Sequence, residues 1–254
     1  MDIYLGTTAI TSRQVTMICA NPLYPARGHR LGLIPARTLL DSGAFSDGHM
    51  GRCRLTPAAA AERQLYWEAA ARKVWGRDYR ADIIVAYDAL ARTANDRATI
   101  KLVQAETWAN NQWLDLHRGL FGERVFVFPL QGNDERSFSS AAARNIPLIR
   151  AGDWCGLGGW CTLGRRKTRL PIFLDVLHRV ASVMVNYRVS HLHLFGISWI
   201  KALVLASRIA KNYGVTLSTD SAAPMRLQQW GRERCYGRTL EQTLAWYHNK
   251  LRWL

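Results

Sequence analysis

The sequence predicts an α/β fold, a compact TIM-type (β/α)8 barrel that forms a single domain over residues 1–254. Apolar runs of strand length alternate with segments whose apolar residues recur at helical spacing, and this alternation is typical of a mainly parallel sheet. A chain of 254 residues, 48% of them hydrophobic, can bury the core of one barrel. No repeat, low-complexity tract or linker-like stretch marks a domain boundary. The pattern does not place the final strand, so a doubly wound open sheet is the alternative.

The first strand-like run, LLDSGAFS at 39–46, is the most informative stretch of the chain. Its apolar residues end at Asp41, and the chain turns at once through Ser42 and Gly43. A carboxylate at the end of a buried strand, followed by a glycine turn, is how a barrel presents a catalytic acid to solvent. Similar runs end in a polar residue or a glycine at 82–90, 124–132, 155–160, 191–198 and 214–221. We therefore expect one ring of functional groups at the carboxyl ends of the strands.

Helices are expected between these runs and at the end of the chain. The segment 57–75 opens with Pro57, which suits the first turn of a helix, and is rich in alanine. Apolar residues at helical spacing predict further helices at 98–118, 171–188 and 199–213, and a last helix at 239–253 closes the chain.

Three histidines fall within these elements. His191 and His193 alternate along a strand-like run, so we expect one of them to point inward and the other outward. His178 lies in an expected helix. A packed or solvated side chain, rather than a metal ligand, is the expected state of all three.

The chain is strongly basic, with a formal net charge of +15 and a pI of about 10.2. Excess lysine and arginine suits a polyanionic partner, because neutralising phosphates releases counterions. A basic surface that serves solubility alone is the alternative. Ten tryptophans offer aromatic faces, some of which can stack on exposed bases. A nucleic acid is therefore the expected partner.

Targeting signals and a disulfide framework are both absent from the pattern. No apolar run reaches about 18 residues, and the first residues lack the basic and apolar regions of a signal peptide. We expect a cytoplasmic protein without membrane contact. The cysteines are odd in number and dispersed, which predicts reduced thiols. They are Cys19, Cys53, Cys155, Cys161 and Cys235.

Six short motifs follow one another along the chain. They are Asp41-Ser42-Gly43-Ala44-Phe45, Tyr87-Asp88, Leu130-Gln131-Gly132, Leu157-Gly158-Gly159, Leu194-Phe195-Gly196 and Thr219-Asp220-Ser221-Ala222-Ala223-Pro224-Met225-Arg226. Their order and spacing resemble the tRNA-guanine transglycosylase superfamily, which includes the 7-deazaguanine DNA transglycosylases. The resemblance runs from about residue 37 to 226, roughly three quarters of the chain.

The resemblance implies that two carboxyl groups cleave an N-glycosidic bond. Asp220 would be the nucleophile that forms a covalent sugar–enzyme intermediate, and Asp41 would be the general acid/base. Structural roles are the alternatives. The residues around Asp220 form a good capping sequence, and those around Asp41 form a good turn.

The resemblance also implies a pocket for a base flipped out of its helix. Asp88 would accept hydrogen bonds from a ring N–H and an exocyclic amine, and the Gln131 amide would donate to a carbonyl. The glycine pair 158–159 (Gly158, Gly159) would let the main chain approach the base closely. Phe45 and Tyr87 are candidates to sandwich the base, with core packing as the alternative.

Two features depart from the tRNA enzymes of this superfamily. Their zinc-binding cysteine and histidine cluster has no counterpart, because only Cys235 and His248 follow Asp220. Their glutamate that helps the site alternate between two bases is also missing, since 158–165 reads GGWCTLGR. We therefore expect no metal, no other cofactor, and DNA rather than tRNA as the partner. The missing glutamate disfavours base exchange.

Basic residues near these motifs are the candidates for contacts to phosphate, with a solvated loop as the alternative. They are Arg165, Arg166, Lys167, Arg169 and Arg226.

The favoured hypothesis is a DNA glycosylase that hydrolyses the bond of a flipped-out, modified base, an activity that would suit defence against phage DNA. A DNA transglycosylase that exchanges guanine for a 7-deazaguanine base is the alternative. A tRNA-guanine transglycosylase and a non-catalytic nucleic-acid binder are less favoured. The pattern indicates neither the base nor the oligomeric state.

Overall fold

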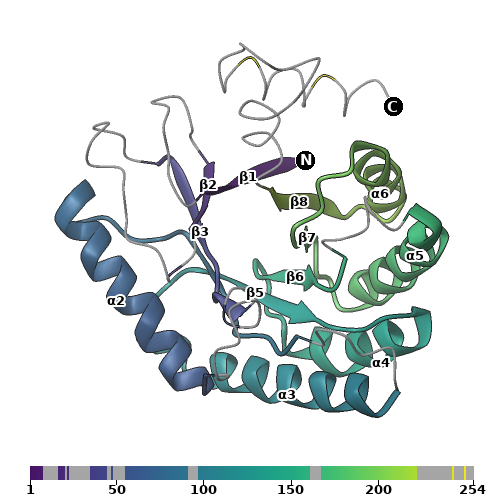
Figure 1. Cartoon of the computed structure of the whole chain (residues 1–254), viewed down its shortest axis with the longest axis horizontal. Helices are drawn as coiled ribbons and strands as arrows, with labels where there is room; N and C mark the ends of the chain where they lie inside the picture. Colours follow the sequence, from purple (N-terminus) through teal and green to yellow (C-terminus); the bar gives the residue numbers. More distant parts are fainter. Residues whose placement is uncertain are drawn as a thin grey trace.

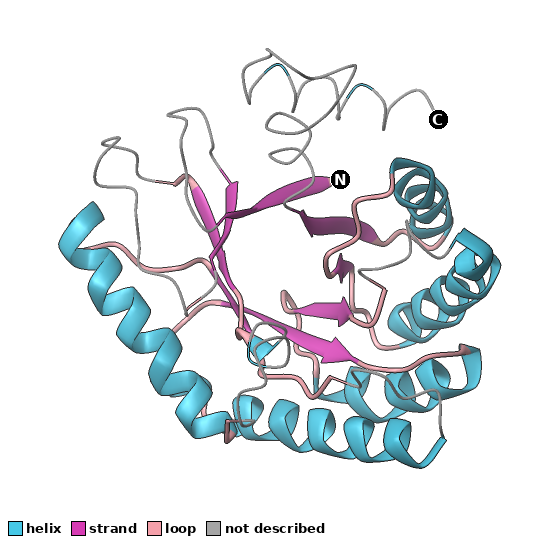
Figure 2. Ribbon diagram, in the orientation of Figure 1, coloured by secondary structure: helices cyan, strands magenta, loops and turns pink. Residues whose placement is uncertain are grey.

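The computed structural model of the chain describes residues 1–7, 17–20, 22, 35–44, 47, 55–90, 97–160, 167–221, 242 and 249. It shows an α/β domain with strands at the centre and helices outside them (Figures 1 and 2). The strands are β1 Asp2–Thr7, β2 Met17–Ala20, β3 Arg37–Leu40, β4 Ile83–Val85, β5 Val125–Leu130, β6 Trp154–Leu157, β7 His191–Leu194 and β8 Thr216–Ser221. The α-helices are α2 Pro57–Trp75, α3 Arg97–Leu116, α4 Glu135–Asn145, α5 Leu170–Asn186 and α6 Ile200–Asn212. Short 3-10 helices are η2 Arg118–Leu120, η3 Ile146–Leu148 and η4 Lys167–Arg169.

The eight described strands are all parallel and lie in chain order around the sheet. β1 pairs with β2 and also with β8, where Tyr4 lies opposite Asp220, so the ring of strands closes. One described helix follows each of the strands β3 to β7, from α2 to α6 in turn. The expected α/β class and parallel sheet are confirmed. The connections after β1, β2 and β8 fall largely outside the described residues, so a full set of eight helices stays a prediction.

Local signals account for the helix boundaries. The side chain of Thr56 caps α2 by accepting a hydrogen bond of 3.2 Å from the Ala59 N–H, and Gly76 ends the helix at a φ of 113°. The expected helices at 57–75, 98–118, 171–188 and 199–213 match α2, α3, α5 and α6 to within two residues at each end. The expected helix at 239–253 lies almost wholly outside the described residues.

Three elements have no counterpart among the runs and helices named from the sequence. These are β1, β2 and α4. The strand β2 has only four residues, and α4 is an 11-residue helix of mostly serine, alanine and charged residues. A capping box defines the start of α4, because Asp134 and Ser137 each accept a hydrogen bond from the other's N–H.

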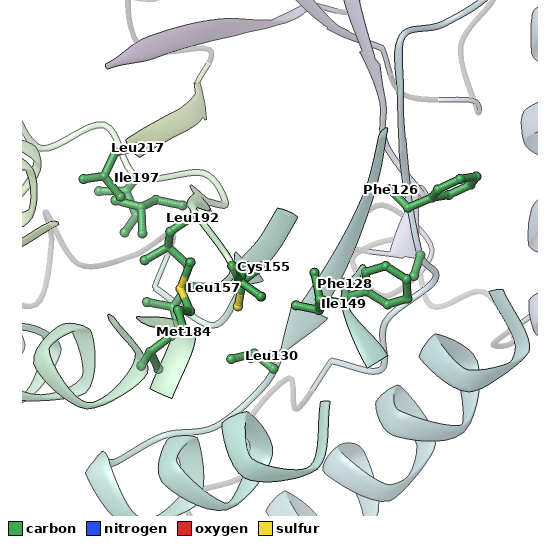
Figure 3. Close-up of a cluster of buried hydrophobic side chains, with 14 of the residues drawn as sticks. Phe126, Phe128, Leu130, Ile149, Cys155, Leu157, Met184, Leu192, Ile197 and Leu217 are labelled. Carbon is green, nitrogen blue, oxygen red and sulfur yellow. The ribbon is translucent and has the colours of Figure 1, made fainter. Parts of the chain in front are cut away.

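Alternate residues of the strands build two apolar layers. In β5, Phe126 and Phe128 point outward and pack in the larger layer, between the strands and the helices (Figure 3). Val127 points inward and packs with Leu39 and Trp154 in the smaller layer, inside the ring of strands. Side chains therefore fill the interior of the ring, and the polar groups that a ligand could reach lie at the strand ends.

Two remaining expectations concern membranes and thiols. Within the described part of the chain, no helix is both long enough and apolar enough to span a membrane. The two described cysteines, Cys19 and Cys155, are buried and free. This matches the expected reduced state for these two residues.

Candidate active site

Four of the predicted site residues meet at one end of the barrel, because parallel strands all deliver their carboxyl ends there. Asp41 directly follows β3, Asp88 lies three residues beyond β4, Gln131 directly follows β5, and Asp220 is the second-last residue of β8. The carboxyl groups interact. Burial raises the pKa of both Asp41 and Asp88, and the charges of Asp220 and Asp41, respectively, raise them further.

The carboxylate of Asp220 is held by the neighbouring strand β7. Its Oδ1 accepts a hydrogen bond of 2.9 Å from the Gly196 N–H and lies 3.1 Å from Nε2 of His193. Gly196 has a φ of 66°, a conformation that favours glycine and aims its N–H at the carboxylate. Among the described residues, these hydrogen bonds reach Oδ1 only. With 21% of its side chain exposed, Asp220 is partly open to solvent.

Asp41 lies in a different environment. Its backbone N–H donates to the Ala20 carbonyl over 2.8 Å, and its Oδ1 accepts from the Ser42 N–H over 2.8 Å. Burial and the charge of Asp220 nevertheless raise the pKa of Asp41 to about 6. A carboxyl group with this pKa can give and take a proton near neutral pH.

Two side chains of α2 fix the turn that carries Asp41. The amide of Gln64 donates to the carbonyls of Asp41 and Val85 over 3.1 and 3.0 Å, which ties the ends of β3 and β4 together. The guanidinium of Arg63 donates to the Ser42 carbonyl. A Cβ on Gly43 would lie 2.6 Å from that guanidinium, and the φ of 78° also favours glycine. A side chain at position 43 would therefore be strained by the backbone and would displace the Arg63 guanidinium.

The predicted base-binding residues form a second cluster beside Asp41. Oδ2 of Asp88 accepts a hydrogen bond from the Gln131 amide, while burial and the charge of Asp41 raise the pKa of Asp88 to about 7. The amide of Gln104 donates to the Gln131 carbonyl over 2.9 Å. A Cβ on Gly158 would lie 2.3 Å from the Gln131 amide nitrogen, so only glycine leaves room for the Asp88–Gln131 pair. Gly159 follows with a φ of 82°.

Tyr87 has a supporting position. Its ring packs with Ala44 and Ala60 and is 5% exposed. Its hydroxyl accepts from the Leu55 N–H over 3.2 Å and donates to Asp47 over 3.3 Å. Tyr87 therefore connects the segment after β3 with α2. Stacking of a base between Tyr87 and Phe45 stays a prediction, because Phe45 lies outside the described residues.

The basic candidates divide into two groups. Lys167 is exposed, whereas Arg169 is half-buried, with its guanidinium 4.7 Å from the centre of the Trp160 ring and a hydrogen bond of 2.6 Å to the Asn133 carbonyl. Arg169 therefore stabilises the loop after β5. The candidates that lie outside the described residues are Arg165, Arg166 and Arg226.

The expectation that His191 and His193 point to opposite faces is wrong. Residues two apart on a strand share a face, and both rings contact Oγ of Ser218, at 2.7 and 2.8 Å. His193 is fully buried and reaches Asp220, a contact that the motifs did not predict.

Metal binding receives no support from the described side chains, which contain no group of three or more His, Cys, Asp or Glu placed to hold an ion. The expected independence of metal stays a prediction.

Comparison with known proteins assigns no family or activity to this chain. No family model matches the chain, and no curated protein matches it. One similar solved structure is described as "a putative lyase/mutase from Burkholderia cenocepacia J2315". It shares 12% sequence identity, covers 92% of both chains and has a TM-score of 0.39. A similarity this low supports no conclusion about fold or activity.

Proposed function

We propose that this protein is an enzyme that cleaves the N-glycosidic bond of a base flipped out of DNA, on a (β/α)8 barrel. The observation that supports this most is the unlike pair of carboxyl groups at the barrel mouth. Asp220 accepts a hydrogen bond from the Gly196 N–H and contacts His193, whereas burial and the charge of Asp220 raise the pKa of Asp41 to about 6. Two carboxyl groups whose environments differ in this way suit a nucleophile and a proton donor.

In the proposed reaction, Oδ2 of Asp220 bonds to C1′ of the sugar as the bond from C1′ to the base nitrogen breaks. The electron pair of the broken bond goes to the base, and protonated Asp41 donates a proton to it. Water then attacks C1′, the ester bond to Asp220 breaks, and Asp41 takes the proton from the water. The products are a free base and an abasic sugar, with both carboxyl groups restored.

The Asp88–Gln131 pair suits a base with a guanine-like edge. A carboxylate can accept from a ring N–H and an exocyclic amine, and the amide can donate to a ring carbonyl. Burial raises the pKa of Asp88 to about 7, so ionising this carboxyl group costs free energy while no base is bound. Two donors from a base would compensate the charge, which gives a physical reason for selectivity.

The charge distribution of the described surface supports DNA as the partner. Helices in a barrel begin at the end where the strands finish. Exposed basic residues lie in the first turn of α3 and α6, where a negative residue is the usual stabilising choice, and also in η4 and, beside Asp134 and Glu135, in α4. They are Arg97 in α3, Arg136 in α4, Lys167 in η4 and Lys201 in α6. Phosphates around a flipped base would meet these side chains.

Base exchange is the second candidate, in which a 7-deazaguanine base rather than water attacks the intermediate. The preformed Asp88–Gln131 pair favours it, because an incoming base would find the same recognition groups as the departing one. The missing glutamate after the glycine pair favours hydrolysis.

A trapping experiment tests the proposed function. Protein is mixed with DNA that carries modified bases, denatured within seconds, and resolved by denaturing electrophoresis. We expect a covalent protein–DNA adduct that maps to the peptide containing Asp220, absent from Asp220→Asn and present in Asp175→Asn, a control on the exposed side of α5. An adduct at another residue would contradict the assignment. Analysis of the DNA then separates abasic sites from exchanged bases.

A further inference from the structure

A continuous chain of hydrogen-bonded side chains runs beneath Asp220 inside the barrel. From Oδ1 of Asp220, it passes to Nε2 of His193 over 3.1 Å and from Nδ1 of His193 to Oγ of Ser218 over 2.8 Å. It continues to Nε2 of His191 over 2.7 Å, and from Nδ1 of His191 to Oγ1 of Thr216 over 2.8 Å. The register of β7 and β8 creates this chain, because His193 pairs with Ser218 and His191 with Thr216.

We propose that His193 is a positioning residue that holds the Asp220 carboxylate in its reacting orientation, and that Ser218 and His191 fix the tautomer of His193. This inference rests on the proposed role of Asp220 as nucleophile. His193 itself is fully buried, so it acts through the carboxylate and does not reach the substrate.

The count of protons defines the tautomer. An ionised Asp220 only accepts, so Nε2 of His193 must carry a hydrogen. Nδ1 of a neutral His193 is then an acceptor, and the Ser218 hydroxyl donates to it. The oxygen of Ser218 in turn accepts from Nε2–H of His191. Every donor in this part of the chain therefore points toward Asp220.

His191 is suited to anchor the far end of the chain. Burial lowers the pKa of His191 to about 3, so its ring is neutral. The ring stacks on Trp154 with 3.6 Å between centres and 15° between planes. The Thr216 hydroxyl has one hydrogen and two acceptors within reach, the Ser190 carbonyl at 2.9 Å and Nδ1 of His191 at 2.8 Å. The carbonyl also accepts from the Thr216 N–H, so when Nε2 of His191 is the donor to Ser218 the hydroxyl hydrogen is available to Nδ1.

Aromatic rings enclose His193 and restrict its rotation. Phe195 and Tyr4 meet its ring edge to face, with centres 4.8 and 6.1 Å away. Phe195 itself fits over a strand glycine, since a Cβ on Gly156 would lie 2.4 Å from the Phe195 ring. The enclosure fixes the ring, and the hydrogen bonds fix its protons, which is how a preorganised site avoids reorganisation during reaction.

Nitrogen NMR of protein labelled with 15N-histidine tests the tautomer without any substrate. At pH 7 we expect His193 as the neutral Nε2–H form, with signals assigned from His193→Gln. Asp220→Asn and Ser218→Ala should each shift the His193 signals, whereas Asp175→Asn should not. A neutral Nδ1–H form in the wild type, or signals unchanged in Asp220→Asn, would overturn the inference.

Kinetics on base release supplies the second test. Glutamine can place an amide nitrogen near the position of Nε2, whereas asparagine matches only Nδ1 and leaves Asp220 without this donor. We expect His193→Gln to retain kcat within about tenfold and His193→Asn to lose about 10²-fold in kcat with little change in KM. His178→Gln, on the exposed side of α5, is the matched control.

The two tests separate the inference from the proposed function. If the wild type forms no adduct and releases no base, the proposed function fails, while the NMR result still reports on the His193–Asp220 contact. If the wild type is active and His193→Asn equals it in kcat, the positioning role alone is wrong. Should His193→Asn fail to fold, Ser218→Ala replaces it, with an expected loss of kcat of about tenfold and unchanged KM.

Discussion

The interior of the barrel differs between its two sides. On the side of β3, β4 and β5, the inward residues are fully buried and apolar, as at Leu39, Ile83 and Val127. On the side of β7 and β8, the inward residues are hydrogen-bonded and polar, as at His193 and Ser218. Asp41 ends an apolar strand and Asp220 ends a polar one. The two aspartates therefore lie in different environments, because the inward residues of the strands that carry them differ in polarity.

The largest expected effect comes from Asp220→Asn, which removes the nucleophile from the polar side. The amide keeps an oxygen for the Gly196 N–H, so the fold and the DNA affinity should be preserved. We expect base release to fall by several orders of magnitude, because an amide cannot capture the sugar cation. Single-turnover release of base, measured beside Asp175→Asn, checks this; activity within tenfold of wild type would refute the assignment.

Asp41→Asn tests the apolar side and should cost roughly 10²–10⁴-fold, the usual contribution of a proton donor. A substrate whose base leaves more easily should recover part of the loss, because it needs less protonation. Release from matched substrates with good and poor leaving bases measures this. An equal loss on both would argue against the role of an acid, provided that thermal unfolding shows a folded variant.

Removing apolar side chains should affect stability rather than chemistry. Ile83→Ala deletes a fully buried side chain inside the ring, and we expect a loss of about 2–5 kcal/mol in the free energy of unfolding. Urea denaturation measures it, and base release per folded molecule should remain near that of the wild type. A loss of activity without loss of stability would show that the two sides are not separate in function.

Asp88→Asn should stabilise the protein, in a manner that depends on pH. The pKa of Asp88 is raised to about 7, so between pH 4 and 7 the unfolded chain ionises this group while the folded protein keeps it protonated. Its contribution to stability therefore falls as pH rises through this window. At pH 8 we expect the variant to be more stable by on the order of 1–3 kcal/mol, with the difference absent below pH 4. Urea denaturation at pH 4 and pH 8 checks the sign; a variant less stable at pH 8 would contradict it.

The smallest effect is expected at the rim. Lys167→Gln should weaken DNA binding slightly and reduce the slope of log K against log salt by about 0.9 if one phosphate contact is lost. Lys73→Gln, at the end of α2 far from the strand ends, is the matched control. Titrations at several salt concentrations distinguish them, and equal slopes for both would remove Lys167 from the interface.

Local motifs predicted the residues that sit at strand ends. Asp41, Asp88, Gln131 and the glycine pair are each adjacent to an apolar run, so the pattern placed them at one end of a parallel sheet. His193 and Ser218 could not be found this way, since their contact depends on the register between β7 and β8, and register is a long-range property. The raised pKa of Asp41 likewise depends on Asp220, which lies far away in the chain.

The helix α4 escaped prediction because its segment is polar. Of its buried side chains, Phe138 alone is large and apolar, so few apolar residues mark this helix in the sequence. Tyr87 was a candidate to sandwich the base, with core packing as the alternative, and its ring packs against Ala44 and Ala60.

The central claim is that Asp41 and Asp220 together cleave a base from DNA. Its most direct test is mass spectrometry of the free bases released from DNAs that carry different natural modifications, after incubation with wild type, Asp220→Asn, Asp41→Asn and Asp175→Asn. The account predicts that at least one base is released by the wild type and by Asp175→Asn, and by neither active-site variant. Equal release by wild type and Asp220→Asn, or release from tRNA with none from any DNA, would contradict it.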